Sequence, residues 1–98
     1  MTKVSEGSLQ DETGFTWEMG YYVKSISIDT AEGGDSLPVV YGIKIERVNQ
    51  SQPIKQIISE ETDGITDSYE EAEKWAILMA HGGVTPLHLH DAVDDLVG

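Results

Sequence analysis

Four stretches in the first part of the chain have the pattern of β-strands. Residues 15–19 alternate strictly between apolar and polar side chains, which is the period of a half-buried strand. Residues 21–28 and 39–46 are rich in β-branched and aromatic side chains, and residues 54–58 form a shorter run of this kind. Gly20 separates the first two stretches. The pattern predicts a small antiparallel sheet of three to four strands.

The strand predicted over residues 39–46 has one clearly apolar face. This face is made by Tyr41, Ile43 and Ile45, which alternate with small or polar side chains. In residues 21–28 the apolar side chains change faces after Val23. This change predicts either a β-bulge near residues 24–25 or two halves that pack on different surfaces.

The second part of the chain changes to the period of a helix. Ser68 with Glu71 three residues later is a capping box, in which hydroxyl and carboxylate each satisfy a backbone N–H. The glycine pair at 82–83 indicates where this helix ends. Thr85 and Pro86 are typical of the cap and first position of a second helix.

These elements predict an α+β fold, in which the small antiparallel sheet is packed by two C-terminal helices. We expect the helices to cover the face of Tyr41, with Trp75 and Leu89 buried. Residues 1–14 are polar and contain two glycines, so they are predicted to form a flexible N-terminal arm that contributes at most one edge strand. Residues 15–98 form the single α+β domain, with an acidic loop at residues 60–64.

The composition restricts the chemistry. Six Lys and Arg residues stand against eighteen Asp and Glu residues, and the net charge is −12. Residues 50–98 carry two basic and ten acidic groups, whereas residues 1–49 carry four and eight. Such a surface repels nucleic-acid phosphate and anionic lipid, so we expect no direct binding of nucleic acid or membrane and a preference for a basic partner. Solubility alone is an alternative explanation of the charge.

Four absences in the sequence exclude further classes of protein. The chain has no cysteine, which excludes disulfides, thiolate zinc sites and a catalytic thiol. The first residues lack the apolar segment of a signal peptide, so a cytoplasmic location is expected. The glycine pair at 33–34 lacks the Lys-Ser/Thr of a phosphate loop. The G-x-S-x-G pattern of a nucleophile elbow does not occur in the sequence. We therefore expect a protein that is not an enzyme.

A segment rich in histidine and aspartate near the C-terminus is the candidate metal site. His88, Asp91 and Asp95 are spaced i, i+3 and i+7, and His90 and Asp94 are spaced i and i+4, so each set shares one helix face. The alternative is a row of exposed polar positions. We favour it because His88 and His90 would point roughly 200° apart on a helix and could not reach one ion. No metal or cofactor is expected, and His88, Asp91 and Asp95 remain possible interaction residues.

The aromatic side chains are a second candidate for recognition. Aromatic residues at strand and helix positions more often belong to the core than to a binding surface. Tyr21 and Tyr22 are adjacent in a predicted strand, so they must point to opposite faces. We therefore expect Tyr22 to face solvent and to be available for an interaction.

The C-terminal segment resembles a family of small uncharacterised clostridial (Firmicutes) proteins. The shared pattern is V-[ST]-P-x-H-L-x-D-[AV]-V-x-D-[FL], which residues 84–96 match, and residues 39–46 are similar to the family's strand. The resemblance implies a cytoplasmic Firmicutes protein of unknown function with this fold. The acidic stretch at 59–67 and the long N-terminus depart from the pattern.

Three roles are compatible with these features. The first hypothesis is a non-enzymatic protein-interaction or regulatory module, which binds a partner through a sheet edge or a groove beside the helices. The alternative is an acidic mimic of nucleic acid that inhibits a DNA- or RNA-binding protein. The second alternative is a protein that binds a divalent metal.

Overall fold

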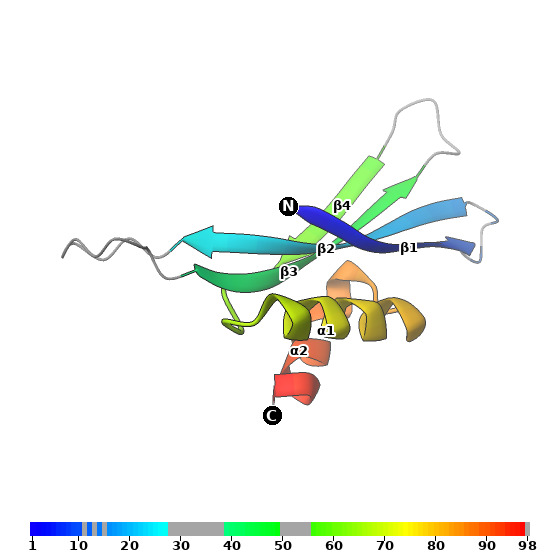
Figure 1. Cartoon of the computed structure of the whole chain (residues 1–98). Helices are drawn as coiled ribbons and strands as arrows, with labels where there is room; N and C mark the ends of the chain where they lie inside the picture. Colours follow the sequence, from blue (N-terminus) through cyan, green and yellow to red (C-terminus); the bar gives the residue numbers. More distant parts are fainter. Residues whose placement is uncertain (11, 13, 15, 28–38, 50–55, 98) are drawn as a thin grey trace.

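A computed structural model describes residues 1–10, 12, 14, 16–27, 39–49 and 56–97, and shows an antiparallel sheet with helices on one face (Figure 1). The strands are β1 (Thr2–Gln10), β2 (Thr16–Ser27), β3 (Val39–Asn49) and β4 (Gln56–Glu61). They are followed by α1 (Tyr69–His81), the 3-10 helix η1 (Pro86–His88) and α2 (Leu89–Val97). The sheet order is β1-β2-β3-β4, so each strand pairs with its neighbour in sequence. The predicted α+β fold is confirmed.

The N-terminal segment forms the edge strand that the sequence left open. β1 pairs with β2 from Thr2 opposite Val23 to Gln10 opposite Thr16, with an irregularity in register between Lys3 and Ser5. Val4 packs against the core. The flexibility expected for residues 1–14 stays a prediction, but the pairing of β1 places most of this segment in the sheet.

β2 is one continuous strand, so the prediction that Gly20 separates two strands is wrong. The ring of Tyr22 lies over Gly20, where an added Cβ would be 2.9 Å from the tyrosine Cε1. A methyl group there would push against the far end of the Tyr22 side chain, so this glycine gives the ring room over the strand and does not break the strand. Residues 15 and 28 of the predicted strands, and residues 54 and 55, lie outside the described residues.

The change of apolar face within β2 comes from packing on two surfaces. The register between β2 and β3 is unbroken from Trp17 opposite Asn49 to Ser27 opposite Val39. The expected bulge at residues 24–25 is therefore absent from the described β2–β3 ladder. Val23 is buried in the core, whereas Ile26 is half-buried on the opposite face of the strand.

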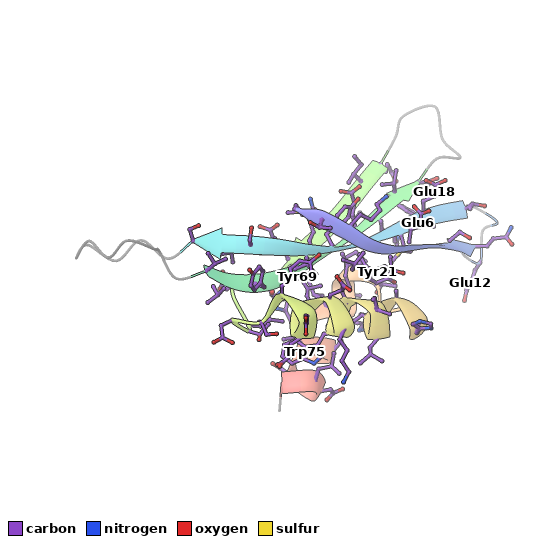
Figure 2. The ribbon with its side chains drawn as sticks, in the orientation of Figure 1. Glu6, Glu12, Glu18, Tyr21, Tyr69 and Trp75 are labelled. Carbon is purple, nitrogen blue, oxygen red and sulfur yellow. The ribbon has the colours of Figure 1, made fainter. Side chains whose placement is uncertain are left out.

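The helices pack on the predicted face of the sheet. Ile43 and Ile45 are completely buried and Leu89 of α2 contributes to the same core, as expected. Trp75, which was expected to be buried, is only half-buried and packs against the edge of this core (Figure 2). The reason is that the buried stripe of α1 is made by smaller side chains, namely Ala72, Ala76 and Met79.

A buried tyrosine ties the sheet to the turn after α1. Tyr21 lies between the sheet and α1, and its hydroxyl donates a hydrogen bond of 2.8 Å to the carbonyl oxygen of Val84 (Figure 2). Burial raises the pKa of this phenol. Its neighbour Tyr22 lies on the other face of the sheet and is half-buried.

Both ends of α1 have the predicted caps, although the capping box is half formed. The Ser68 hydroxyl accepts a hydrogen bond from the Glu71 backbone N–H at 3.3 Å. The Ser68 N–H donates to the Thr66 hydroxyl at 3.1 Å, which replaces the expected carboxylate of Glu71. At the other end Gly83 has a φ of 67°, which favours glycine, and the Val84 N–H donates to the Met79 carbonyl oxygen.

Replacing Ser68 with alanine is expected to lower the unfolding free energy by about 1 kcal/mol, because the Glu71 N–H loses its cap. Thr85→Ala is the matched control, since Thr85 caps η1 without a side-chain hydrogen bond. Urea unfolding of both variants checks this. Equal midpoints for the two variants would mean that the Ser68 cap contributes nothing.

The second helix begins later than predicted. Pro86–His88 form one turn of 3-10 helix, in which the His88 N–H donates to the Thr85 carbonyl oxygen at 3.0 Å, and the α-helix starts at Leu89. Pro86 is buried, so this turn is fixed by packing as well as by its backbone hydrogen bond.

Candidate functional site

Strand β4 is the most exposed strand of the sheet. All six of its residues are exposed, and they include Glu60 and Glu61, which the sequence placed in an acidic loop. That prediction was wrong because acidic residues are rare in strands that are buried, whereas β4 is at the edge and faces water. Lys44 of β3 lies opposite Glu61 in the register, so the negative charge of Glu61 faces a positive charge on the neighbouring strand.

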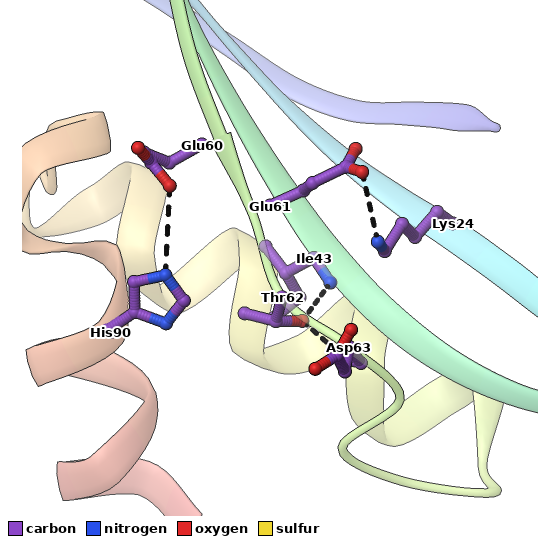
Figure 3. A network of polar contacts seen from close by, with 7 residues as sticks. All are labelled: Lys24, Ile43, Glu60, Glu61, Thr62, Asp63 and His90. Carbon is purple, nitrogen blue, oxygen red and sulfur yellow. Dashed lines mark hydrogen bonds and ion pairs between the residues drawn. The ribbon is translucent and has the colours of Figure 1, made fainter.

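The two carboxylates at the end of β4 point to opposite faces of the sheet (Figure 3). Glu60 faces the helices and its Oε2 is 3.7 Å from Nε2 of His90 in α2. Glu61 faces the other side and its Oε1 is 3.4 Å from Nζ of Lys24 in β2. The His90–Glu60 pair is exposed on both sides and contributes little to stability, whereas the lysine of the Lys24–Glu61 pair is only 15% exposed.

A buried threonine fixes the end of β4 against β3. The Thr62 hydroxyl accepts a hydrogen bond of 3.0 Å from the Ile43 N–H and donates one of 2.7 Å to the Asp63 carbonyl oxygen (Figure 3). The Thr62 N–H donates to the Ile43 carbonyl oxygen at 2.9 Å. These contacts hold β4 in register while its outer edge stays exposed.

β4 also carries two large apolar side chains that are exposed. Ile57 is 55% exposed and Ile58 is 46% exposed. β4 is the last strand in the sheet order, so within the described residues no strand pairs with its outer edge. Its backbone N–H and C=O groups on that side are available to a further strand.

The short helix η1 lies against β4 and brings one predicted site residue, His88, near this strand, together with Leu87. Leu87 is 83% exposed and His88 is exposed. His88 precedes the first turn of α2, so it does not continue the α-helical face of Asp91 and Asp95 as the predicted spacing required.

The remaining histidine and aspartate candidates lie on α2. Asp91, Asp94 and Asp95 are exposed, and His90 contacts Glu60 rather than the helical neighbour Asp94 that the sequence suggested. Among the residues that the structure describes, no group of three or more His, Cys, Asp or Glu side chains is arranged to hold a metal ion.

Tyr22 lies on the face of the sheet away from the helices, so it is not brought together with His88, Asp91 or Asp95. Two lysines flank its ring, with Nζ of Lys3 at 5.6 Å and Nζ of Lys44 at 5.8 Å from the centroid. The Tyr22 side chain, and to a smaller extent Glu6, raise the pKa of Lys3.

The same face is hollowed beside Tyr22, with a volume of about 540 Å³. Its polar lining includes Lys3, Glu6, Ser8, Glu18, Tyr22 and Glu46. Lys3 pairs with Glu6 at 3.6 Å and Lys44 pairs with Glu46 at 3.7 Å. The lysine charges of this face are thus compensated by carboxylates of the chain itself.

Comparison with protein families gives a match over almost the whole chain. The model of a family of unknown function, DUF6514, matches residues 2–98. The chain belongs to this family. No curated protein and no solved structure matches the chain. No helix in the described ranges has the length and apolar character needed to cross a membrane.

Membership of the DUF6514 family confirms the expectation of an uncharacterised family. The match includes β1 and β4 as well as the C-terminal segment that carried the resemblance. Sequence reasoning named a sheet edge as a binding surface but missed that the exposed edge is β4. The double isoleucine followed by a double glutamate was a usable signal, because paired apolar residues in an edge strand put one of them on the solvent face whichever face is buried.

Proposed function

We propose that this protein is a non-enzymatic protein-interaction module and that β4 is the edge that receives its partner. The observation that carries the proposal is the exposure of Ile57 and Ile58 on an edge strand whose six residues are all exposed. An extended segment that adds to such an edge gains main-chain hydrogen bonds and covers the apolar side chains.

The other edge of the sheet is protected in the ways that natural sheets use. β1 has an irregular register between Lys3 and Ser5 and contains Gly7, both of which weaken a regular edge. β4 has an unbroken register with β3 over its whole length. The contrast supports β4, and not β1, as the docking edge.

The charge of the chain favours a basic occupant. Glu60 and Glu61 lie on β4 itself, and residues 50–98 carry ten acidic against two basic groups. A positively charged partner is attracted over a distance of about a Debye length, which is roughly 10 Å at moderate salt. A second copy of this chain, with its own charge of −12, is repelled. The proposed occupant is therefore an extended basic segment of another protein.

The alternatives are supported less well. The described acidic residues are spread over β1, β2, β3, β4, α1 and α2 rather than along one regular face, which argues against mimicry of a nucleic-acid backbone. A metal-binding role would need ligands from more than one element, and the histidines of η1 and α2 are exposed and apart from such a group. We further propose a cytoplasmic location and a clostridial origin, on the basis of the C-terminal motif that residues 84–96 match.

The matched pair Ile58→Lys and Leu78→Lys tests the proposal. Ile58 on β4 and Leu78 on α1 are 46% and 47% exposed, so both changes place a lysine at an equally exposed apolar position. A partner isolated with the wild-type chain and then purified is expected to bind Ile58→Lys at least about tenfold more weakly and Leu78→Lys unchanged, as measured by calorimetry.

Hydrogen exchange locates the contact. Partner binding is expected to protect backbone amides of β4, because an added strand pairs with them. Equal affinity of the two variants, or protection confined to α2, would contradict the proposal. Competition by DNA or RNA for the purified partner would instead favour the nucleic-acid mimic.

A further inference from the structure

β4 has an apolar half and an acidic half. Ile57 and Ile58 lie in its first half, Glu60 and Glu61 end it, and Ser59 separates them. All of these residues are exposed. A strand lying along β4 therefore meets apolar side chains at one end and carboxylates at the other.

On both faces of β4 an apolar residue comes before an acidic residue along the strand. Ile58 and Glu60 share the helix side, where Glu60 contacts His90. Ile57 and Glu61 share the other side, where Glu61 contacts Lys24. Each face of an added strand would therefore find one apolar and one acidic position, two residues apart on the helix side and four residues apart on the other side.

Building on the proposed function, we infer that β4 binds a segment with two consecutive basic residues, one small polar residue and then two apolar residues, running antiparallel to β4. Antiparallel pairing continues the pattern of the whole sheet and is slightly more stable per residue than parallel pairing. It places the basic residues opposite Glu61 and Glu60, and the apolar residues opposite Ile58 and Ile57.

The helix side of the edge offers an additional apolar contact. η1 lies against β4 and carries Leu87, which is 83% exposed. An apolar residue of the segment that lies beside Ile58 is on the same side of the sheet as η1. The exposed Leu87 on that side of the sheet favours apolar side chains at that end of the segment.

The contact between Glu60 and His90 leaves the carboxylate available to the segment. The atoms are 3.7 Å apart and both side chains are more than half exposed. A guanidinium binds a carboxylate in a bidentate manner, which an imidazole cannot do. An arginine of the segment therefore replaces His90 at Glu60.

The test uses the full chain labelled with 15N and three short capped peptides. The forward peptide is Thr-Lys-Arg-Thr-Ile-Val-Thr, the reversed peptide has the opposite order, and the acidic peptide carries Glu-Glu in place of Lys-Arg. We expect the forward peptide to shift the amide signals of β4, and the acidic peptide to bind at least about tenfold more weakly because like charges meet across the edge.

A spin label reports the direction of the bound peptide. Attached to the amino end of the forward peptide, it is expected to broaden the amide signals of Glu61 and Thr62. Attached to the carboxyl end, it is expected to broaden those of Gln56 and Ile57. The opposite assignment would overturn the antiparallel direction.

Two sets of matched variants test the chemistry. Glu60→Gln combined with Glu61→Gln should weaken the forward peptide about threefold to tenfold at low salt, whereas Glu70→Gln, an exposed acid of α1, should not. Leu87→Ser should weaken it, and Leu78→Ser should not. Unchanged affinity in the β4 double variant would overturn the basic half of the motif.

The outcomes separate this inference from the proposed function. This inference fails if the reversed peptide binds as tightly as the forward one. It also fails if no peptide shifts the amide signals of β4 while Ile58→Lys still abolishes binding of the natural partner. In both cases β4 remains the docking edge. If no peptide shifts β4 and the natural partner also binds Ile58→Lys normally, both fail. Dimerisation of the chain through β4 in sedimentation experiments would make a second copy the occupant and would overturn both.

Discussion

The Leu89→Ala variant is expected to lose about 2–5 kcal/mol of unfolding free energy, which is a large part of the stability of a domain of this size. Leu89 is 0% exposed and lies in the core that α1 and α2 form with the sheet. Removing its isopropyl group leaves a cavity in the core cluster that also contains Ile43 and Ile45, which are completely buried as well. Urea unfolding followed by circular dichroism measures the change.

Leu87→Ala provides the control from the same segment. This leucine is two residues earlier and 83% exposed, so its truncation should change the unfolding free energy by less than about 0.5 kcal/mol. Similar unfolding midpoints for the two variants would show that the packing of η1 and α2 on the sheet is not as described.

Gly42→Ala is expected to cost about 1–3 kcal/mol, because a methyl group at this position has no room. An added Cβ would lie 2.7 Å from the Asp63 carbonyl oxygen and 2.9 Å from the Thr62 carbonyl oxygen. These are backbone atoms, and the hydrogen bonds between Thr62 and Ile43 hold them beside β3. Thermal and urea unfolding both report the loss.

Gly7→Ala in β1 is the matched control. A Cβ at Gly7 has no heavy atom within 4 Å, so the substitution should leave stability unchanged or raise it by about 0.4–1 kcal/mol through the unfolded state. A Gly42→Ala variant as stable as Gly7→Ala would refute the close passage of residues 62–63 over β3.

Alternation and capping predicted most of the fold because alternation follows from burial of one face and capping from a hydrogen bond between near neighbours in the sequence. The face of Ile43 and Ile45 is buried by the helices, so its period of two is visible in the sequence. The start of α1 was predicted because the Ser68 hydroxyl has to satisfy a backbone group three residues away. Gly20 was misread because the ring that lies over it belongs to Tyr22, and the rotamer of that side chain is not encoded in a local pattern.

The docking edge could not be predicted from any single segment of the sequence. Glu60 and His90 are thirty positions apart in the numbering, and only the packing of α2 beside β4 brings them together. The register with β3 fixes which of Ile57 and Ile58 faces the helices. The orientation of Tyr22 toward solvent was predictable, because adjacent strand residues must face opposite ways.

The position of the helices after all four strands has a consequence for synthesis of the chain on the ribosome. Hairpins form in about 1–10 μs, so the sheet can assemble almost as soon as its strands are made. At about 5–20 residues per second, residues 69–97 take roughly 1.5–6 seconds to follow. During that interval the face with Tyr21 and Ile43 has nothing from α1 or α2 to cover it. Protection against aggregation of the nascent chain must then come from elsewhere, and the acidic residues already synthesised are suited to that task.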